Sequence, residues 1–474
     1  MPFSRLVGWK HHESVQLPRL VASRCGVLVM AKTYWVETLG CPKNHVDSDK
    51  VTGQLLRDGY RAADSPEGAD LVVVNTCAFI DEARQESIDV ILDLADRKHD
   101  ASRLVVTGCM AERYGDELAE ALPEVDLVAG FGESLTASVP VSLGKRSHSV
   151  RTSELLELPR TPSSTPWAYL KVAEGCDRIC GFCAIPSFRG PQRSRTVESL
   201  LAEVESLKTG SEVPLREVVL IAQDLASFGR DRSSGREGDP DDFSRAAKAG
   251  EQPIVEVLKA LKGSVEWVRL LYLYPSGLTP TLIEAMLEAE VPYFDLSLQH
   301  VTRPMLKRMR RFGDGDKFLE RIAMIREMAP DAAFRSSFIV GYPGETEADH
   351  DALLSFIEQA RLDWAGFFPY SAEEGTYAAD LEDQVEPDLV AERLREVREL
   401  QDAITFELRD ELIGQTMTVL VDKPGQARST REAPEIDGII SVPMSIAAGT
   451  MVDVEIVAAM GTDLEAVLVG GTDA

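Results

Sequence analysis

The sequence predicts an α/β protein of several domains: a parallel α/β domain first, a partial (β/α) barrel second and a small antiparallel β-barrel last. A chain of 474 residues is too long for a single hydrophobic core, so several domains are expected. Short β-branched apolar runs alternate with amphipathic stretches as far as about residue 410, which is typical of parallel sheets covered by helices. Beyond that point the apolar runs follow one another without helical stretches between them, which indicates antiparallel β-structure.

The first thirty-one residues show none of these patterns. A charged, histidine-containing segment precedes one short apolar stretch, GVLVMA, whereas a secretory signal needs a longer apolar region and a small-residue cleavage site. We therefore expect residues 1–31 to form a loose extension, with Met30 as an alternative start. No apolar run approaches the roughly eighteen residues that a membrane span requires, so we expect a cytoplasmic protein without a membrane partner. Disulfides are rare in the cytoplasm, which favours metal-binding or catalytic roles for the seven cysteines.

The first folded domain is expected over residues 32–150. Three apolar runs in it end in a cysteine: TYWVETLGC at Cys41, ADLVVVNTC at Cys77 and SRLVVTGC at Cys109. Each run is short, continuous and β-branched, as in strands that are buried on both faces of a parallel sheet. The stretches between the runs have amphipathic helical spacing and acidic first turns. This alternation predicts a βαβ series.

A segment rich in proline, serine and threonine, residues 151–166, is expected to link this domain to the barrel, residues 167–410. Six strand–helix units suit a partial (β/α) barrel, in which functional residues gather at the C-terminal strand ends. The insert 230–253 is expected to be a mobile loop because it is polar and glycine-rich, and it is too short for a domain. The six expected strands span residues 167–173, 217–223, 267–275, 293–300, 333–343 and 364–371.

The C-terminal domain is expected over residues 411–474, with four strands that suit a small antiparallel barrel. This domain has three basic and ten acidic residues, a net charge of −7, and the whole chain has 50 basic and 78 acidic residues, a net charge of −28. Such a charge is a poor match to a nucleic-acid backbone and a better match to a basic protein partner. Solubility alone is the simpler explanation of the same charge. The expected strands span residues 416–421, 437–442, 451–460 and 464–470.

Three cysteines, Cys176, Cys180 and Cys183, follow the first barrel strand with the spacing C-x3-C-x2-C. Thiolates bind soft metals and iron–sulfur clusters, and three of them can hold three irons of a 4Fe–4S cluster. The fourth iron then stays open to a chelator such as S-adenosylmethionine, whose sulfonium one electron can cleave to give a 5′-deoxyadenosyl radical. A zinc site completed by a distant residue and a chance group of reduced thiols are the alternatives. The position at the first strand end of a six-unit barrel favours the radical chemistry.

A second set of three thiols follows from topology. Cys41, Cys77 and Cys109 each end a strand of one predicted parallel sheet, and such strand ends line one edge, where ligands bind. Helix N-termini also point toward that edge and favour thiolates. The three thiols could therefore hold a second cluster with one open iron. Buried cysteines that act as small hydrophobic residues are the alternative. Cys25, in the extension, is assigned no role.

Weaker signals come from other strand ends of the barrel. In SSFIVGYPGET, the backbone of the glycine-rich turn could approach a bound nucleoside, or the turn could be purely structural. Polar side chains at two more strand ends could contact cofactor or substrate, or could cap helices and satisfy buried backbone groups. The residues concerned are Gly341, Pro343, Gly344 and Glu345 in the turn, and Gln223, Asp224, Gln299 and His300 at the other two strand ends.

Several motifs resemble one family. EGCDRICGFCAIPSFRG resembles the cluster motif of the radical S-adenosylmethionine methylthiotransferases, and LGCPKNHVDSD around Cys41 resembles that of the ribosomal-protein aspartate methylthiotransferases, the RimO family. Relatives that act on tRNA adenosine usually carry Gln-Met where this chain has Pro42 and Lys43. EAPEIDG, Glu432–Gly438, is also similar to the ribosomal-protein branch. The resemblance extends from Lys32 to Gly470 and excludes the extension and the insert.

The resemblance implies a methylthiotransferase domain with an auxiliary 4Fe–4S cluster, a radical S-adenosylmethionine barrel and a C-terminal TRAM domain. It assigns Cys41, Cys77 and Cys109 to the auxiliary cluster, and Cys176, Cys180 and Cys183 to the catalytic cluster. Phe182 would touch the adenine of S-adenosylmethionine, and the GYPGE turn would contact the nucleoside. The implied substrate is an aspartate, modified at its β-carbon, on the twelfth protein of the small ribosomal subunit. A tRNA-adenosine methylthiotransferase and a non-catalytic iron–sulfur carrier are the alternatives.

The resemblance also implies a mechanism. One S-adenosylmethionine methylates a sulfur at the auxiliary cluster; a second is cleaved at the barrel cluster, and its radical removes hydrogen from the aspartate so that the substrate radical collects the methylthio group. Cleavage needs a cluster of low reduction potential, which predicts an apolar setting to which Ile179, Phe182 and Ile185 contribute. The expected partners are a basic ribosomal protein, free or on the ribosome, and an electron donor. The chain itself is expected to be a monomer.

Overall fold

The computed structural model describes residues 31–136, 155–233 and 252–470. Residues 1–30 of the predicted extension and residues 234–251 of the predicted insert lie outside these residues. The insert's first residues, Arg230–Ser233, form the short helix α7. The chain divides into two compact units, Met1–Thr161 and Pro162–Ala474, and each is described by itself.

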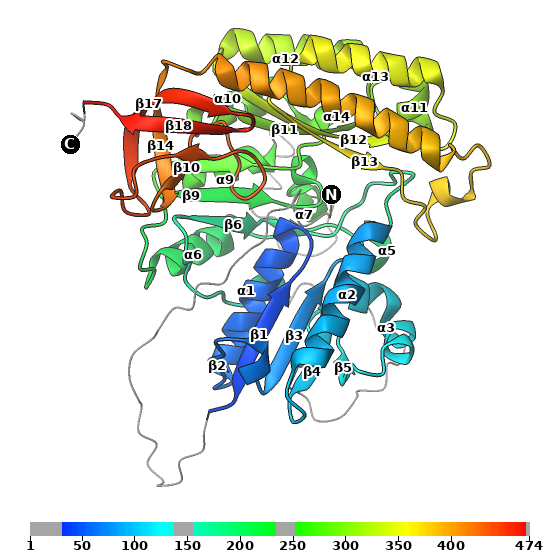
Figure 1. Ribbon diagram of the computed structural model, residues 1–474, viewed down its shortest axis with the longest axis vertical. Helices are drawn as coiled ribbons and strands as arrows, with labels where there is room; N and C mark the ends of the chain where they lie inside the picture. Colours follow the sequence, from blue (N-terminus) through cyan, green and yellow to red (C-terminus); the bar gives the residue numbers. More distant parts are fainter. Residues whose placement is uncertain (1–30, 137–154, 234–251, 471–474) are drawn as a thin grey trace. The chain divides into compact units, whose positions relative to one another are not determined.

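The first unit contains a five-stranded sheet in the order β2-β1-β3-β4-β5, in which every pairing is parallel. The three strands that end near cysteines were predicted and are confirmed, whereas β2 and β5 have two residues each and leave no periodic signal in the sequence. Figure 1 shows the sheet in blue and cyan. The strands are β1 Thr33–Thr38, β2 Arg61–Ala62, β3 Leu71–Thr76, β4 Arg103–Gly108 and β5 Leu127–Val128, and the helices are α1 Pro42–Arg57, α2 Asp81–Arg97 and α3 Cys109–Ala121.

The strand order of this sheet locates its binding edge. The chain first places β2 on one side of β1. It then crosses to the other side of β1, where it adds β3, β4 and β5 in turn. The order therefore reverses between β1 and β3, and ligands of such open α/β sheets bind beyond the C-terminal strand ends at this point. Cys41 follows β1 and Cys77 follows β3.

The second unit contains the six predicted barrel strands, which are confirmed. They form two three-stranded parallel sheets, β10-β9-β6 and β11-β12-β13, and a parallel bridge between Leu273 and Leu296 connects the two. Among the described residues no pairing joins β6 to β13, so the barrel is partial. The strands are β6 Trp167–Lys171, β9 Glu217–Ile221, β10 Trp267–Leu270, β11 Tyr293–Gln299, β12 Ala333–Val340 and β13 Trp364–Pro369.

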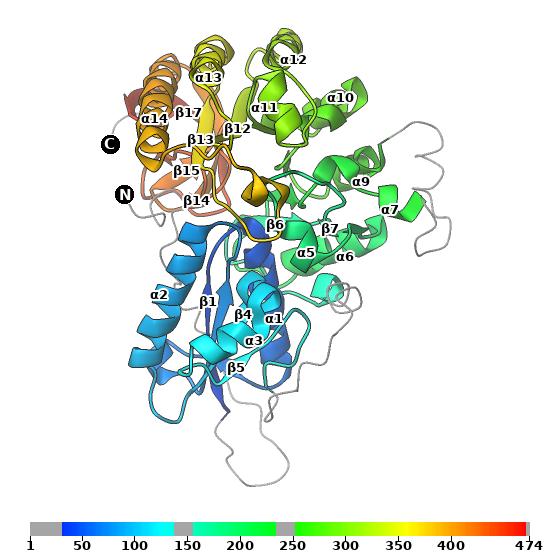
Figure 2. The ribbon, with the colours of Figure 1, turned by 90° about the vertical axis from the view of Figure 1, so that its right-hand side faces the viewer.

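Helices cover the outside of these strands, and Figure 2 shows α9 to α14 arranged around them. Their apolar faces pack onto the strands in one large core, for example through Leu258 on α9, Ile322 on α12 and Ile357 on α13. The helices are α6 Val197–Lys208, α9 Pro253–Leu261, α10 Pro280–Glu288, α11 Arg303–Arg308, α12 Gly315–Met328, α13 Glu347–Ala360 and α14 Pro387–Asp410.

The C-terminal strands close a small barrel in the order β14-β15-β16-β18-β17. The predicted architecture is confirmed, with two differences: the short strand β15 was not predicted, and the pair β16–β18 is parallel while the other pairs are antiparallel. The barrel has its own apolar core around Val419, Ile440 and Ile456. The strands are β14 Thr416–Lys423, β15 Gln426–Arg428, β16 Ile440–Ser441, β17 Met451–Met460 and β18 Asp463–Leu468.

The segment Arg428–Asp437, which contains most of the EAPEIDG stretch, covers the N-terminal ends of the six barrel strands. Each strand contributes one residue from its first three positions to a hydrogen bond or ion pair with this segment. These residues are Tyr169, Glu217, Arg269, Tyr293, Arg335 and Trp364. The stretch is therefore structural, and the functional end of the barrel is the opposite one, at the C-terminal strand ends.

Candidate active site

The loop with Cys176, Cys180 and Cys183 leaves β6 through the two-residue strand β7, Ala173–Glu174. This strand pairs with β8, Arg193–Ser194, and the Cys176 N–H donates to the carbonyl of Gly190 at 3.0 Å. Between strand and thiols lies Gly175, with φ of +82°, where a Cβ would lie 2.2 Å from the carbonyl oxygen of Pro191. Only glycine fits there, so the two ends of the thiol loop lie in close contact.

Glu174 holds the base of this loop together. Its buried carboxylate accepts hydrogen bonds from Lys171 Nζ at 2.7 Å, Arg189 Nη1 at 2.9 and 3.0 Å and Gln223 Nε2 at 2.6 Å. Burial alone would raise the pKa of Glu174, but the charges of Arg189 and Lys171 outweigh it and hold that pKa well below its usual range. The ionised carboxylate thus joins β6, the loop and the strand end after β9.

Sequence reasoning missed Glu174, although it stands two residues before the first thiol of the quoted motif. Gln223, a predicted cofactor contact, uses its amide nitrogen on Glu174. Its amide oxygen is buried and has no hydrogen-bond partner among the described residues. A contact between Gln223 and a cofactor stays a prediction, and the carbonyl oxygen is the atom that could make it.

The three thiols of the loop lie within electrostatic reach of one another. Burial raises the pKa of Cys183 to about 12, and the charges of Cys180 and Cys176 add to this rise. Burial likewise raises the pKa of Cys176 to about 11. The Cys176 and Cys183 thiols therefore stay protonated near pH 7 without a metal, and a metal's positive charge is what would make them thiolates.

Two arginines, Arg178 within this loop and Arg311 from another segment, share one aromatic ring. The guanidinium carbons of Arg178 and Arg311 lie 3.9 and 4.2 Å from the ring centre of Tyr274. Arg178 also pairs with Asp224 at 2.6 Å, and Arg311 Nη1 donates to Cys180 Sγ at 3.4 Å. Asp224, noted from the sequence, thus orients Arg178. The positive charges and the hydrogen bond to sulfur suit an anionic iron–sulfur cluster.

The GYPGE turn follows β12 and is held in place by its own glutamate. Gly341 and Gly344 have φ of +78° and +82°, and a Cβ at Gly344 would lie 2.7 Å from the guanidinium carbon of Arg308. The Glu345 carboxylate accepts from the Gly341 N–H at 2.8 Å and pairs with Arg393 at 2.9 Å. Glu345 therefore shapes the turn. Nucleoside contacts of Gly341, Pro343, Gly344 and Glu345 stay predictions.

The end of β11 has an irregular backbone. A register shift precedes Gln299, which has φ of +72°. The next residue, His300, is buried; its Nδ1 accepts from the Thr302 N–H at 3.2 Å, and its Nε2 lies 4.0 Å from Glu345. Burial lowers the pKa of His300 to about 4, so its ring is neutral near pH 7. His300 thus caps the strand end, and a cofactor contact of Gln299 stays a prediction.

The apolar setting predicted for the thiol loop is only partly present. Phe182 packs against a cluster that includes Met305, Ile339 and Tyr342, as expected. Ile179 is 73% exposed, so its predicted shielding role is wrong. Polar contacts hold the inner side of this loop, and Ile179 points outward from it. The apolar side chains beside the loop therefore come from neighbouring segments.

The second set of thiols lies at the C-terminal strand ends of the first unit, as predicted. Asn44, on α1, links the three strand ends: its Nδ2 donates to the carbonyls of Leu39 and Thr76, both at 2.9 Å, and its Oδ1 accepts from Cys109 Sγ at 3.4 Å. A Cβ on Gly40, with φ of +92°, would lie 2.9 Å from Cys77 Sγ. The segments that carry the three cysteines thus converge on Asn44, which sequence reasoning missed although it follows Cys41 by three residues.

Within the described residues no group of three or more His, Cys, Asp or Glu side chains is arranged to hold one metal ion. A zinc ion needs all its donors within about 2.0–2.3 Å of one point. The thiolates of a four-iron cluster need not converge on one point, because each of them binds a different iron. Three cysteines on one glycine-hinged loop, with arginines beside them, therefore fit a cluster as a donor set.

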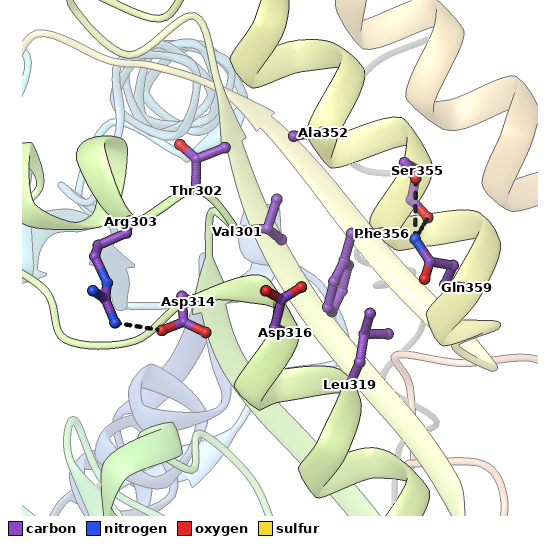
Figure 3. A pocket seen from close by; sticks show the side chains of 11 residues that line it. Val301, Thr302, Arg303, Asp314, Asp316, Leu319, Ala352, Ser355, Phe356 and Gln359 are labelled. Carbon is purple, nitrogen blue, oxygen red and sulfur yellow. Dashed lines mark hydrogen bonds and ion pairs between the residues drawn. The ribbon is translucent and has the colours of Figure 1, made fainter.

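A cavity of about 550 Å³ lies elsewhere in the second unit, against α11, α12 and α13. Figure 3 shows Arg303 and Asp314, paired at 3.1 Å, and the apolar side chains of Val301, Leu319 and Phe356 around it. None of the cysteines and none of the predicted cofactor contacts line it. Among the described residues no helix is long and apolar enough to cross a membrane.

Comparisons with known proteins agree with this architecture. The sequence matches the uncharacterized protein family UPF0004 over residues 33–130, the radical S-adenosylmethionine superfamily over residues 170–357 and the TRAM domain over residues 413–469. Among solved structures, one of the radical S-adenosylmethionine methyltransferase TsrM from Kitasatospora setae matches 84% of this chain and 80% of the TsrM chain. The identity is 14% and the TM-score is 0.42, so the family assignment comes from the sequence matches alone.

The sequence relatives are much closer. The ribosomal protein uS12 methylthiotransferase RimO of Geobacter sulfurreducens is 42% identical over 426 residues, which cover 85% of this chain and 91% of that protein. The protein of the same name from Moorella thermoacetica is 41% identical and covers 89% of this chain and 95% of its own length. The one from Streptomyces coelicolor is 38% identical and covers 92% of this chain and 96% of its own length. The chain therefore belongs to the RimO family of radical S-adenosylmethionine methylthiotransferases.

Proposed function

We propose that this protein transfers a methylthio group to the β-carbon of an aspartate in ribosomal protein uS12. The observation that carries the proposal is the presence in one chain of two sets of three cysteines. One set lies on the loop after the first barrel strand, and the other lies at the strand ends of the N-terminal sheet. Relatives that are 37–42% identical over most of their length carry the name of this activity, which supports uS12 as the substrate.

Each set of cysteines is proposed to hold one 4Fe–4S cluster. Cys176, Cys180 and Cys183 would bind the cluster at which S-adenosylmethionine is cleaved. The second cluster would be bound by Cys41, Cys77 and Cys109, and the convergence of three strand ends on Asn44 supports it. In both sets, three protein ligands would leave one iron of a four-iron cluster open to a ligand from outside the chain.

When bound, the clusters and S-adenosylmethionine supply the radical and the sulfur; the chain's own residues position them. Glu174 fixes both ends of the thiol loop, and Arg178 and Arg311 place positive charge beside it. The GYPGE turn, which Glu345 holds in shape, presents backbone groups at the end of β12. Phe182 presents an aromatic face beside the loop. These roles of Phe182 and the turn toward the adenosyl group are proposals.

The tRNA alternative is less well supported. Pro42 and Lys43 stand where the relatives that act on tRNA usually carry Gln-Met. Exposed positions of the C-terminal barrel include Asp453, Glu455 and Glu465, and acidic groups repel a nucleic-acid backbone while attracting a basic ribosomal protein. We further propose that the protein acts in the cytoplasm as a monomer and receives electrons from a separate donor.

The proposal predicts where the methyl group comes from. Anaerobically reconstituted protein, given uS12, a reductant and S-adenosylmethionine with a deuterated methyl group, is expected to yield uS12 that carries the deuterated methylthio group on an aspartate. Peptide mass spectrometry measures this product. Formation of 5′-deoxyadenosine without any labelled uS12 would contradict the proposed substrate, and absence of both products would favour a carrier of iron–sulfur clusters.

Replacement of Asn44 by alanine tests the second cluster. The change removes two hydrogen bonds from Asn44 to the strand ends and one from Cys109 to Asn44, at a cost of about 1–3 kcal/mol. We expect iron to fall from about eight to about four per chain while S-adenosylmethionine cleavage persists. Gln54→Ala, on the exposed side of the same helix, is the matched control and should keep all iron. Iron analysis that shows full loading of Asn44→Ala would contradict the role given to Asn44.

A further inference from the structure

We propose that the surface beside the thiol loop docks an acidic protein that carries one electron at a time. This surface, called the docking patch, consists of Ile179, Lys307, Arg310, Phe312 and Tyr377. The inference rests on the proposed function, because cleavage of S-adenosylmethionine consumes an electron that must come from outside the chain.

The patch is continuous because three chain segments are bonded to one another around Gly181. The Gly181 N–H donates to the carbonyl of Met309 at 2.8 Å, and the Gly181 carbonyl accepts from the Ala378 N–H at 2.8 Å. The guanidinium carbon of Arg310 lies 3.8 Å from the ring centre of Tyr377. The thiol loop, residues 307–312 and residues 377–378 therefore form one surface.

Apolar side chains on this surface are unusually open to solvent. Ile179 is 73% exposed and Phe312 is 74% exposed, the latter the largest exposed fraction among the large apolar residues that the structure describes. Tyr377 is 38% exposed. Exposed apolar and aromatic side chains with charges at their rim are typical of protein interfaces.

The charge of the patch is opposite to that of the chain. Lys307 and Arg310 are exposed and make no ion pair within the described residues, whereas Arg308 next to them is paired with Asp383 at 2.8 Å. The chain as a whole has a net charge of −28. Two free cations beside the thiol loop therefore attract an acidic partner and repel a basic ribosomal protein, so that the patch fits an electron donor better than the substrate.

The patch also lies where an electron is needed. Arg311, between Arg310 and Phe312, donates a hydrogen bond to Cys180 Sγ, and Cys180 is only half-buried. In the reaction the donor is oxidised by one electron. That electron breaks the sulfonium C–S bond of S-adenosylmethionine and yields methionine and a 5′-deoxyadenosyl radical. A carrier seated on the patch would bring its redox centre close to the proposed cluster.

The test compares two reductants on the same reconstituted holoenzyme in the presence of uS12. One is a purified acidic flavodoxin, kept reduced, and the other is dithionite, which needs no docking surface. The variant reverses two charges, Lys307→Glu with Arg310→Glu, and the measurements are the initial rate of 5′-deoxyadenosine formation and the mass of uS12. The matched control is Lys262→Glu with Lys317→Glu, two exposed lysines outside the patch whose reversal changes the net charge equally.

We expect the patch variant to need about tenfold more flavodoxin for half-maximal rate, whereas its dithionite-driven rate and iron content stay unchanged. The control variant should behave like the parent with both reductants. Added salt should weaken the flavodoxin reaction of the parent and have much less effect on the patch variant.

An unchanged flavodoxin requirement in the patch variant, or an equal loss with both reductants, would overturn the docking proposal. Failure of the proposed function gives a different result. In that case the parent would make 5′-deoxyadenosine with both reductants and still leave uS12 unmodified, whatever the patch variant does.

Discussion

Cys180→Ala is expected to abolish formation of 5′-deoxyadenosine, whereas Cys77→Ala is expected to keep it and to lose only transfer of the methylthio group. Cys180 lies on the barrel loop beside Arg311, and Cys77 lies at the edge of the N-terminal sheet. Loss of either thiol removes one of three ligands, so each variant should lose one cluster, and iron should fall from about eight to about four per chain. The measurements are iron content, 5′-deoxyadenosine by chromatography and uS12 mass.

Cys25→Ala is the matched control, because Cys25 belongs to neither set of three; it should match the parent in all three measurements. Normal cleavage of S-adenosylmethionine by Cys180→Ala would contradict the assignment of the barrel loop. Normal methylthio transfer by Cys77→Ala would contradict the second cluster and return the N-terminal cysteines to the role of small buried hydrophobic residues.

Glu217→Ala is expected to destabilise the second unit strongly. The Glu217 carboxylate pairs with Arg269 at 2.7 Å and with Arg428 at 2.9 Å, and all three side chains are almost completely buried. Burial alone would raise the pKa of Glu217, but the two arginines hold it below its usual range. Its removal leaves the buried Arg269 guanidinium without a carboxylate partner, whereas Arg428 keeps its pair with Asp422. Such an uncompensated buried charge costs about 3–5 kcal/mol, or roughly 10 °C in the unfolding midpoint.

Thermal unfolding followed by circular dichroism measures this effect. Glu205→Ala is the control: Glu205 pairs with Lys208 on the exposed side of α6, and such pairs contribute about 0–1 kcal/mol. A midpoint for Glu217→Ala that equals that of the control would show that the C-terminal barrel contributes little to the stability of the partial barrel.

The parts of this structure that follow from local sequence were predictable. The strands of the N-terminal sheet and of the partial barrel are short, buried apolar runs, such as Leu71–Thr76 and Glu217–Ile221. Strands of a parallel sheet have such sequences because both of their faces are buried. The barrel thiols stand on one loop, so their spacing alone indicates a cluster. To predict that the cysteines of the N-terminal sheet converge, one further inference was needed: the C-terminal ends of parallel strands share one edge of the sheet.

Contacts between residues far apart in sequence were not predictable. Glu217 and Arg428 are separated by 211 positions, and no local pattern marks their pairing. The EAPEIDG stretch was identified as a family marker, yet its role in closing the barrel depends on six strands that converge on it. Ile179 was misjudged because exposure of a loop residue depends on how neighbouring segments fold around it.

Several candidate residues turned out to have partners inside the protein. Glu345, Asp224 and His300 stand at strand ends, where both cofactor contacts and structural caps occur, and the sequence does not separate these roles. In the structure Glu345 bonds to Gly341 and Arg393, and Asp224 bonds to Arg178. Residues that support the site, such as Glu174 and Asn44, were found only through such contacts.

In the decisive experiment the reconstituted protein receives uS12 and tRNA side by side, together with S-adenosylmethionine and a reductant, and the mass of both is measured. We expect uS12 to gain the mass of CH2S on one aspartate and tRNA to gain nothing. A gain on tRNA, with uS12 unchanged, would contradict the proposed function.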